Sequence, residues 1–288
     1  MSPPEAREAL RAPEEREALR ARAEDRRGAA LAALLLALAA WAAWTTARAG
    51  ATVPGDDAWR RAAAEVRASF RSGDLIEFAP PWIDPVGRLH LGDLIPLDAA
   101  GRMDDARFGR VWVLSIRGAD APELAGARPA LTRELGGVTI RRYDRAPAVV
   151  LDDAARALPT AQTSGVRARG PELVLAELGF TPRRCVQVVP APGGAVTIAF
   201  PKFTLGAELV GYAGLADIFT RRDVRDPGEL EVRVNGEVVA RARLGVDDGW
   251  VRFAAATQPG PAEVTVVARA PSPRARDRLI CFALESRR

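Results

Sequence analysis

A run of 20 residues without a charged side chain, at positions 28–47, constrains this chain most. Its length matches the roughly 20 apolar residues that a helix needs to cross about 30 Å of hydrocarbon. Trp41 and Trp44 lie near one end of the run, and indole rings favour the membrane–water boundary. We therefore expect residues 29–47 to form a transmembrane helix in a lipid bilayer.

The charges on either side of this run predict its orientation. Four arginines between positions 20 and 27 closely precede it, whereas only Arg48 follows it closely. By the positive-inside rule, residues 1–28 form a charged cytoplasmic tail and the chain after the run is exported. We expect a single-pass protein of the bacterial inner membrane whose bulk is periplasmic or extracellular.

Two alternatives to an uncleaved anchor stay open. Ala47-Arg48-Ala49 has the small-x-small form of a signal-peptidase site, and an apolar stretch precedes it. The long, acidic lead before the run favours an anchor over a signal peptide, and both interpretations export the rest of the chain. The other alternative is a buried helix of a soluble protein.

Composition excludes several functional classes. The 41 basic residues are arginines apart from Lys202, and they are scattered among 37 acidic residues, which leaves a net charge of only +4. Because no basic run is interleaved with aromatic residues, we expect no nucleic-acid partner. His90 is the only histidine and the two cysteines form no CxxC pair, so we expect no metal and no cofactor.

Residues 56–158 have the pattern of a small Rossmann-like α/β domain. A helix is expected over 58–70. Three short apolar runs read as strands, at 75–79, 111–116 and 138–143, and a helical stretch closed by glycines, 122–137, separates the last two. Continuously apolar strands with a helix between them predict a parallel sheet covered on both faces. No GxGxxG motif follows a strand, so dinucleotide binding is not expected.

The period of the hydrophobic pattern changes to two from about residue 172, after a connection at 144–171 that holds a short helix. The clearest signal is the hairpin ELEVRVNGEVVARARL, in which Asn235-Gly236 supplies a type I′ turn. About eight short strands with no helix between them predict an antiparallel β-sandwich over 172–288, most simply a jelly roll. The expected fold class is therefore α+β multidomain: the N-terminal helix, the Rossmann-like domain, then the sandwich.

The segments DDAWRRAA, GDLIEFAP, RVWVLSIRG and LGGVTIRRYD follow one another in the α/β part. In that order they resemble the exported domain of bacterial polyprenyl-phosphate-sugar glycosyltransferases, the group of the protein O-mannosyltransferases. Those enzymes carry their catalytic carboxylate in a many-helix membrane domain, whereas this chain has one span, so no catalytic residue carries over. The resemblance implies an envelope setting, with a glycan, a polyprenyl-linked sugar or a membrane glycosyltransferase as partner.

The C-terminal part contains the segments LEVRVNGEVVARA, DDGWVRFAAAT, GPAEVTVVARA and RLICFALESR. These are similar to galactose-binding-like domains and carbohydrate-binding modules. The resemblance implies that Trp250 lies in the core and that a ligand binds to loops at one end of the sandwich.

The segment 79–93 follows the first expected strand, which is where ligands bind in parallel sheets. Trp82 could stack on a sugar ring, and His90 with Asp93 could act as an acid–base pair. The structural alternative is a proline-stiffened loop with a packed tryptophan and a structural histidine.

Two further groups of charged residues lie near turns. Asp217, Arg221 and Arg222 could hydrogen-bond sugar hydroxyls, or they could form ordinary surface ion pairs. The acidic pairs Asp104-Asp105 and Asp247-Asp248 show too few converging oxygens for calcium, so they read as solvated turns.

Cys185 and Cys281 are expected to form a disulfide. On each of their strands the stronger apolar residues share one face and leave the cysteine on the other. The first and last strands of such sandwiches pair antiparallel, which would place the two cysteines opposite each other. Closing a loop of roughly 100 residues would stabilise the fold by about 4–5 kcal/mol. The alternative is a pair of half-buried free thiols.

Together these features favour a membrane-anchored, exported accessory protein without catalysis of its own. It would bind an envelope glycan or lipid-linked sugar, or dock to a membrane glycosyltransferase. The first alternative is a hydrolase or transferase that acts on envelope sugars through His90 and Asp93. The second is a structural scaffold of the envelope.

Overall fold

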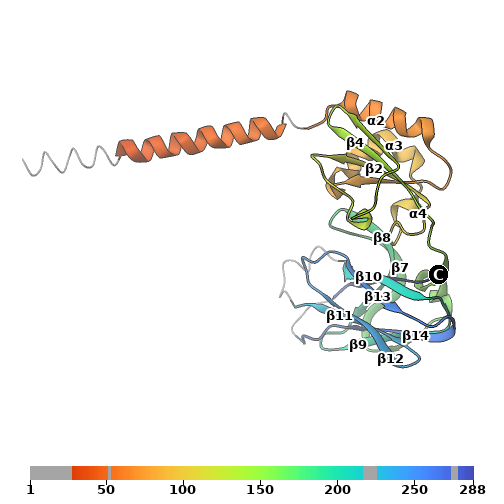
Figure 1. Cartoon of the computed structure of the whole chain (residues 1–288). Helices are drawn as coiled ribbons and strands as arrows, with labels where there is room; N and C mark the ends of the chain where they lie inside the picture. Colours follow the sequence, from red (N-terminus) through yellow and green to blue (C-terminus); the bar gives the residue numbers. More distant parts are fainter. Residues whose placement is uncertain (1–27, 51–52, 217–225, 274–277) are drawn as a thin grey trace, which may run out of the picture. The chain divides into compact units, whose positions relative to one another are not determined.

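A computed structural model describes residues 28–50, 53–216, 226–273 and 278–288. The chain divides into two compact units, Met1–Val53 and Pro54–Arg288. The second unit contains an α/β region followed by a β-sandwich (Figure 1). The expected cytoplasmic tail lies outside the described residues, apart from Gly28.

The first unit contains the helix Gly28–Gly50, which has 23 residues and a mean hydropathy of 1.8. By length and composition it can cross a membrane, although a signal sequence meets the same description. Its leucines and tryptophans are exposed. Near its C-terminal end the rings of Trp41 and Trp44 lie 5.4 Å apart, and the Arg48 guanidinium lies 5.2 Å from the centre of the Trp44 ring.

The α/β region is built on a four-stranded sheet of order β1-β2-β4-β3. Its elements are α2 (Asp56–Ser69), β1 (Leu75–Ala79), η1 (Pro81–Ile83), α3 (Asp84–Leu91), η2 (Gly92–Leu94), α4 (Leu97–Ala100), β2 (Arg110–Ile116), η3 (Pro122–Leu124), β3 (Leu131–Leu135) and β4 (Val138–Asp144). β1 and β2 are parallel and are connected through α3 and α4. Trp59, Ala62 and Val66 of α2 are buried in the same core as Trp112 of β2.

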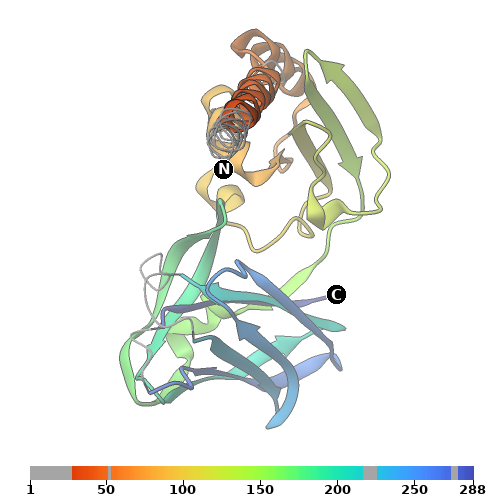
Figure 2. The ribbon, with the colours of Figure 1, turned by 90° about the vertical axis from the view of Figure 1, so that its left-hand side faces the viewer.

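The expected helix over 122–137 is wrong, and with it the expectation of a parallel, Rossmann-like sheet. That stretch forms the short η3 and then β3, which pairs antiparallel with β4, and β4 also runs antiparallel to β2 (Figure 2). The reason lies in Gly136 and Gly137, which both have positive φ and form the two-residue turn between Leu135 and Val138. A glycine pair that reads as a helix end is therefore a hairpin turn, and the sheet is mixed.

Two antiparallel sheets form the predicted β-sandwich. One has the order β13-β10-β15-β8-β7 with β5 also on β15, and the other has the order β12-β11-β14-β9-β6. The strands are β5 (Val150–Asp153), β6 (Gln162–Gly165), β7 (Arg167–Leu178), β8 (Thr181–Pro190), β9 (Ala195–Leu205), β10 (Glu208–Leu215), β11 (Gly228–Val234), β12 (Glu237–Leu244), β13 (Val251–Ala256), β14 (Gly260–Arg269) and β15 (Ile280–Arg287). Side chains of both sheets, among them Phe200, Phe253 and Phe282, share one buried core.

From β8 to β15 successive strands alternate between the two sheets, except for the β11–β12 hairpin. The finer expectation of a jelly roll stays a prediction. The hairpin has the expected turn, because Asn235 and Gly236 both have positive φ and connect Val234 with Glu237. The connection expected at 144–171 contains the short helix α5 (Ala154–Ala157) but also β5 and β6, so strands of the sandwich begin at Val150.

Cys185 and Cys281 are joined by a disulfide with a Cα–Cα distance of 5.6 Å. They lie on the face of their sheet away from Val186 and Val188, which are in the sandwich core. The cysteines are not directly opposite, because Cys281 pairs with Gln187, two residues along β8 from Cys185. The disulfide thus joins β8 and β15 diagonally.

Candidate functional site

A cavity of about 960 Å³ lies between the α/β region and the sandwich within the Pro54–Arg288 unit. We call it the cleft. The α/β region contributes Glu77 of β1, Glu123 of η3 and the loop 100–106. The sandwich contributes the β7–β8 hairpin, the start of β10 and the C-terminal end of β15. The cleft contains arginine–carboxylate pairs, which position its side chains.

Arg287 forms the first group of contacts across the cleft. Its guanidinium donates two hydrogen bonds to Asp104, of 2.9 and 2.8 Å, and two to Glu285, of 3.0 and 2.7 Å. All three side chains are buried, with exposed fractions of 4–7%. Because bidentate charged hydrogen bonds fix both distance and angle, this group holds the loop 100–106 against β15.

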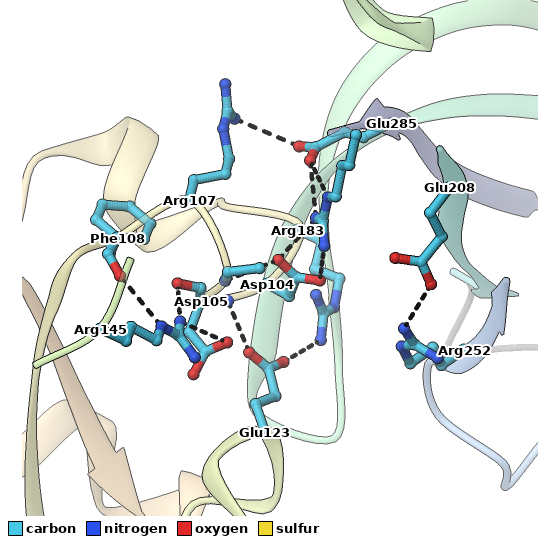
Figure 3. A network of polar contacts seen from close by, with 12 residues as sticks. Asp104, Asp105, Arg107, Phe108, Glu123, Arg145, Arg183, Glu208, Arg252 and Glu285 are labelled. Carbon is cyan, nitrogen blue, oxygen red and sulfur yellow. Dashed lines mark hydrogen bonds and ion pairs between the residues drawn. The ribbon is translucent and has the colours of Figure 1, made fainter. Parts of the chain in front are cut away.

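Arg183 of β8 forms the second group. Its Nη2 atom donates to Glu123 at 3.0 Å, and its guanidinium lies 3.9 Å from the centre of the Tyr212 ring and 5.8 Å from that of Trp250. The other oxygen of Glu123 accepts a 2.9 Å hydrogen bond from the Asp105 backbone N–H (Figure 3). Ring stacking and the ion pair together fix this buried arginine in one orientation.

Glu77 lies in the middle of β1 and forms an ion pair of 2.5 Å with Arg102. Burial raises the pKa of Glu77 to about 7, because the loss of hydration outweighs the attraction of Arg102, and the negative charges of Glu123 and Asp105 add to the rise. Burial likewise raises the pKa of Asp105, against the effect of its hydrogen bond with Arg145. The cleft thus contains carboxyl groups that bind protons more readily than solvent-exposed carboxyl groups do.

Several buried polar atoms of these side chains have no hydrogen-bond partner among the described residues. They are Arg102 Nε, Asp105 Oδ2 and Arg183 Nε. Buried donors and acceptors are normally paired, because each unpaired group loses hydration without compensation. The burial of these three atoms is therefore not compensated by hydrogen bonds among the described residues.

Carboxylate oxygens of Glu77, Asp105 and Glu123 approach within 4.8 Å of one another, which is the spacing of metal ligands. Each of these carboxylates, however, also pairs with an arginine, namely Arg102, Arg145 and Arg183. The three guanidinium charges at least offset those of the carboxylates, because Glu77 is partly protonated near pH 7, so an added cation would meet repulsion as well as attraction. The charge balance favours a neutral polar ligand over a metal ion.

Aromatic side chains line the sandwich side of the cleft. Phe180, at the tip of the β7–β8 hairpin, is 56% exposed and has a φ of +65°, which a bulky residue seldom adopts. Trp250 is half-buried, donates a 2.8 Å hydrogen bond to the Thr181 carbonyl and packs against the disulfide. Trp250 therefore has structural contacts, as the resemblance to carbohydrate-binding modules implies, and it also lines the cleft.

The site residues expected from the sequence do not assemble here. Trp82 is 47% exposed and does not line the cleft. His90 Nε2 lies 3.3 Å from Asp56 and its ring stacks on Trp59, whereas Asp93 pairs with Arg67. The two members of the expected acid–base pair thus each have a different ionic partner. Asp217, Arg221 and Arg222 lie outside the described residues.

Asp104 and Asp105 belong to the cleft, and the expectation that they form a solvated turn is wrong. They are only 5% and 3% exposed. The available signal was Glu77, a carboxylate within the otherwise apolar strand LIEFA. A buried charge needs a partner of opposite sign, so that glutamate could have predicted a charged cluster next to β1.

No protein-family model matches the chain, and no curated protein matches it. Solved structures with partial similarity include the CBM51-2 and INT domains of Clostridium perfringens ZmpB, with 13% identity over 60% of this chain and 40% of that one, at a TM-score of 0.34. A CBM51 from a C. perfringens GH95 protein, in complex with methyl-galactose, has 11% identity over 47% and 100% of the two chains, at a TM-score of 0.31. The C-terminal CBM6 of LamC from Zobellia galactanivorans has 8% identity over 43% and 100%, at 0.26. Such TM-scores do not establish a shared fold, so the sandwich architecture rests on the strand pairing of this chain.

Proposed function

We propose that this protein is a membrane-anchored, exported protein that binds a glycan in the cleft. The observation that carries this proposal is the combination of buried arginine–carboxylate pairs with aromatic rings in one open cavity of about 960 Å³. That volume is at the upper end of the range for small-molecule sites, about 300–1,000 Å³, and suits a ligand of several sugar rings.

The chemistry of the cleft supports a carbohydrate ligand. Sugar hydroxyls both donate and accept hydrogen bonds, and the cleft lining includes the exposed Arg252 as a donor and the half-buried Glu208 as an acceptor. The exposed ring of Phe180 offers an apolar face for the C–H side of a pyranose. Fixed polar groups beside an apolar face bind a neutral polyol with a defined orientation.

The exported location is supported by two features. The helix Gly28–Gly50 has the length to span a bilayer, and more arginines precede it than follow it. The Cys185–Cys281 disulfide fits an oxidising compartment outside the cytoplasm. An envelope glycan or a lipid-linked sugar is the ligand class that such a location offers.

A glycan array tests the proposal with the full chain solubilised in detergent. We expect binding to a small set of related oligosaccharides. This binding should be lost when the protein is mixed with the same free sugars before it is applied to the array. Binding to no glycan, or equal binding to all of them through charge, would refute it. The partnership with a membrane glycosyltransferase stays a prediction from sequence resemblance. Catalysis by His90 and Asp93 likewise stays a prediction from the sequence.

A further inference from the structure

Helix α3 carries an apolar face that is exposed among the described residues of the Pro54–Arg288 unit. The residues on it are Trp82, Pro85, Val86 and Leu89, all exposed. The spacing i, i+3, i+4, i+7 places them on one side of the helix and the η1 turn that precedes it. Trp82 is 47% exposed, Val86 41% and Leu89 83%. A face of this kind on a water-soluble surface normally has a partner.

The opposite side of α3 is also apolar, and it is fixed to the sheet. Ile83, Gly87 and Leu91 are buried. A side chain at Gly87 would come within 2.0 Å of the Phe78 ring, so the helix lies directly on β1. Because the inner side of α3 packs in the core, the helix cannot rotate to bury its outer side. The exposed residues form a rigid surface and not a loosely packed segment.

We propose that this face of α3 docks on the surface of the lipid bilayer in which the N-terminal helix is anchored. Only five residues, 51–55, connect that helix with α2, and an extended chain of this length reaches at most about 18 Å. α3 contacts α2 directly, since Arg67 Nη1 donates a 2.6 Å hydrogen bond to the His90 carbonyl and the Trp59 and His90 rings stack. The tether therefore keeps α2 and the adjoining α3 within reach of the lipid headgroups.

The chemistry of the face suits a bilayer surface. Tryptophan favours the headgroup region, and valine and leucine beside it can enter the outer part of the hydrocarbon. The charged neighbours on the helix are already paired, because Arg88 bonds with Asp84 one turn away. No charge has to lose its partner when the face inserts. This inference rests on the membrane anchor and is independent of glycan binding.

A single fluorescent probe at Leu89 tests this docking in the full chain. Both native cysteines form the disulfide, so a Leu89→Cys variant carries one reactive thiol for an environment-sensitive dye. Val238→Cys is the matched control, because Val238 is an exposed apolar residue on β12 of the sandwich. Each labelled protein is reconstituted into liposomes that contain either plain lipid or lipid with a nitroxide in the upper acyl chain.

In plain liposomes we expect blue-shifted emission from the dye at position 89. We also expect several-fold stronger quenching of this dye by nitroxide lipid than of the dye at position 238. Equal quenching at the two positions, with full access to aqueous iodide, overturns the proposal. Protection of position 89 from both lipid nitroxide and iodide also overturns the proposal, because it shows that a protein covers this face. If this protection weakens when the protein is diluted in lipid, the covering protein is a second copy of the chain. If the protein does not remain bound to the liposomes, the N-terminal helix is not a membrane anchor and the proposal is wrong.

Discussion

The ionisation of Glu77 should give this protein a distinctive dependence of stability on pH. The pKa of Glu77 is about 7 in the folded state, against an ordinary value of 4.5. Between these values the folded protein holds a proton that the unfolded chain has lost, so the free energy of unfolding falls as the pH rises. The full loss above pH 7 is on the order of 3 kcal/mol, and below pH 4.5 the effect is absent. The raised pKa values of Asp105 and Glu285 act in the same direction.

We therefore expect urea unfolding of the wild type to give a lower stability at pH 8 than at pH 5. Glu77→Gln removes the titrating group and keeps a hydrogen-bond acceptor for Arg102, so the difference between the two pH values should shrink in the variant. It should not vanish, because Asp105 and Glu285 remain. An unchanged difference in Glu77→Gln would show that Glu77 is ionised alike in the folded and unfolded states.

Phe180 should contribute little to stability despite its place in a tight turn. It is 56% exposed and has positive φ, a conformation that asparagine tolerates better than phenylalanine. We expect Phe180→Asn to leave the melting temperature unchanged or to raise it slightly, as differential scanning calorimetry would show. A clear destabilisation would mean that the ring packs on the protein and is not held ready for a ligand.

The pairing of the loop 100–106 with β15 should contribute strongly to stability. Arg287→Met keeps the aliphatic stem but leaves the buried Asp104 and Glu285 without their main partner, which should cost about 3–5 kcal/mol. Arg107→Met is the control, since Arg107 is 46% exposed and lies 3.5 Å from Glu285, and it should cost at most about 1 kcal/mol. Similar losses in both variants, measured by chemical unfolding, would contradict this account of the cleft.

The elements also show how far the sequence predicts the fold. β1 and the β11–β12 hairpin follow from local signals, an apolar run and an Asn-Gly turn between alternating residues. The structure of the stretch 122–137 does not follow from local signals, because a Gly-Gly pair can end a helix or form a hairpin turn. The pairing of β3 with β4 selects the hairpin turn at Gly136-Gly137. The cleft could not be predicted either, because Asp104 and Arg287 are 183 residues apart and only tertiary folding brings them together.

The Pro54–Arg288 unit can bind an envelope glycan only if it lies outside the cytoplasm. We expect a phosphatase that is active only after export to work when fused after Arg288, and a fluorescent protein that folds only in the cytoplasm to stay dark there. The reverse pattern would exclude the exported orientation. Mass spectrometry of the mature protein distinguishes anchor from signal peptide, because an N-terminus at Gly50 would show cleavage.

Glycan binding in the cleft can be measured by calorimetric titration of the detergent-solubilised full chain with the preferred array oligosaccharide. We expect saturable binding by the wild type and by Val238→Asn, a change at an exposed apolar residue away from the cleft. We expect roughly tenfold weaker binding by Phe180→Asn, the loss of about 1.4 kcal/mol that one stacked ring supplies. Equal affinity of the wild type and Phe180→Asn, with both proteins folded, would place the ligand elsewhere and contradict the account.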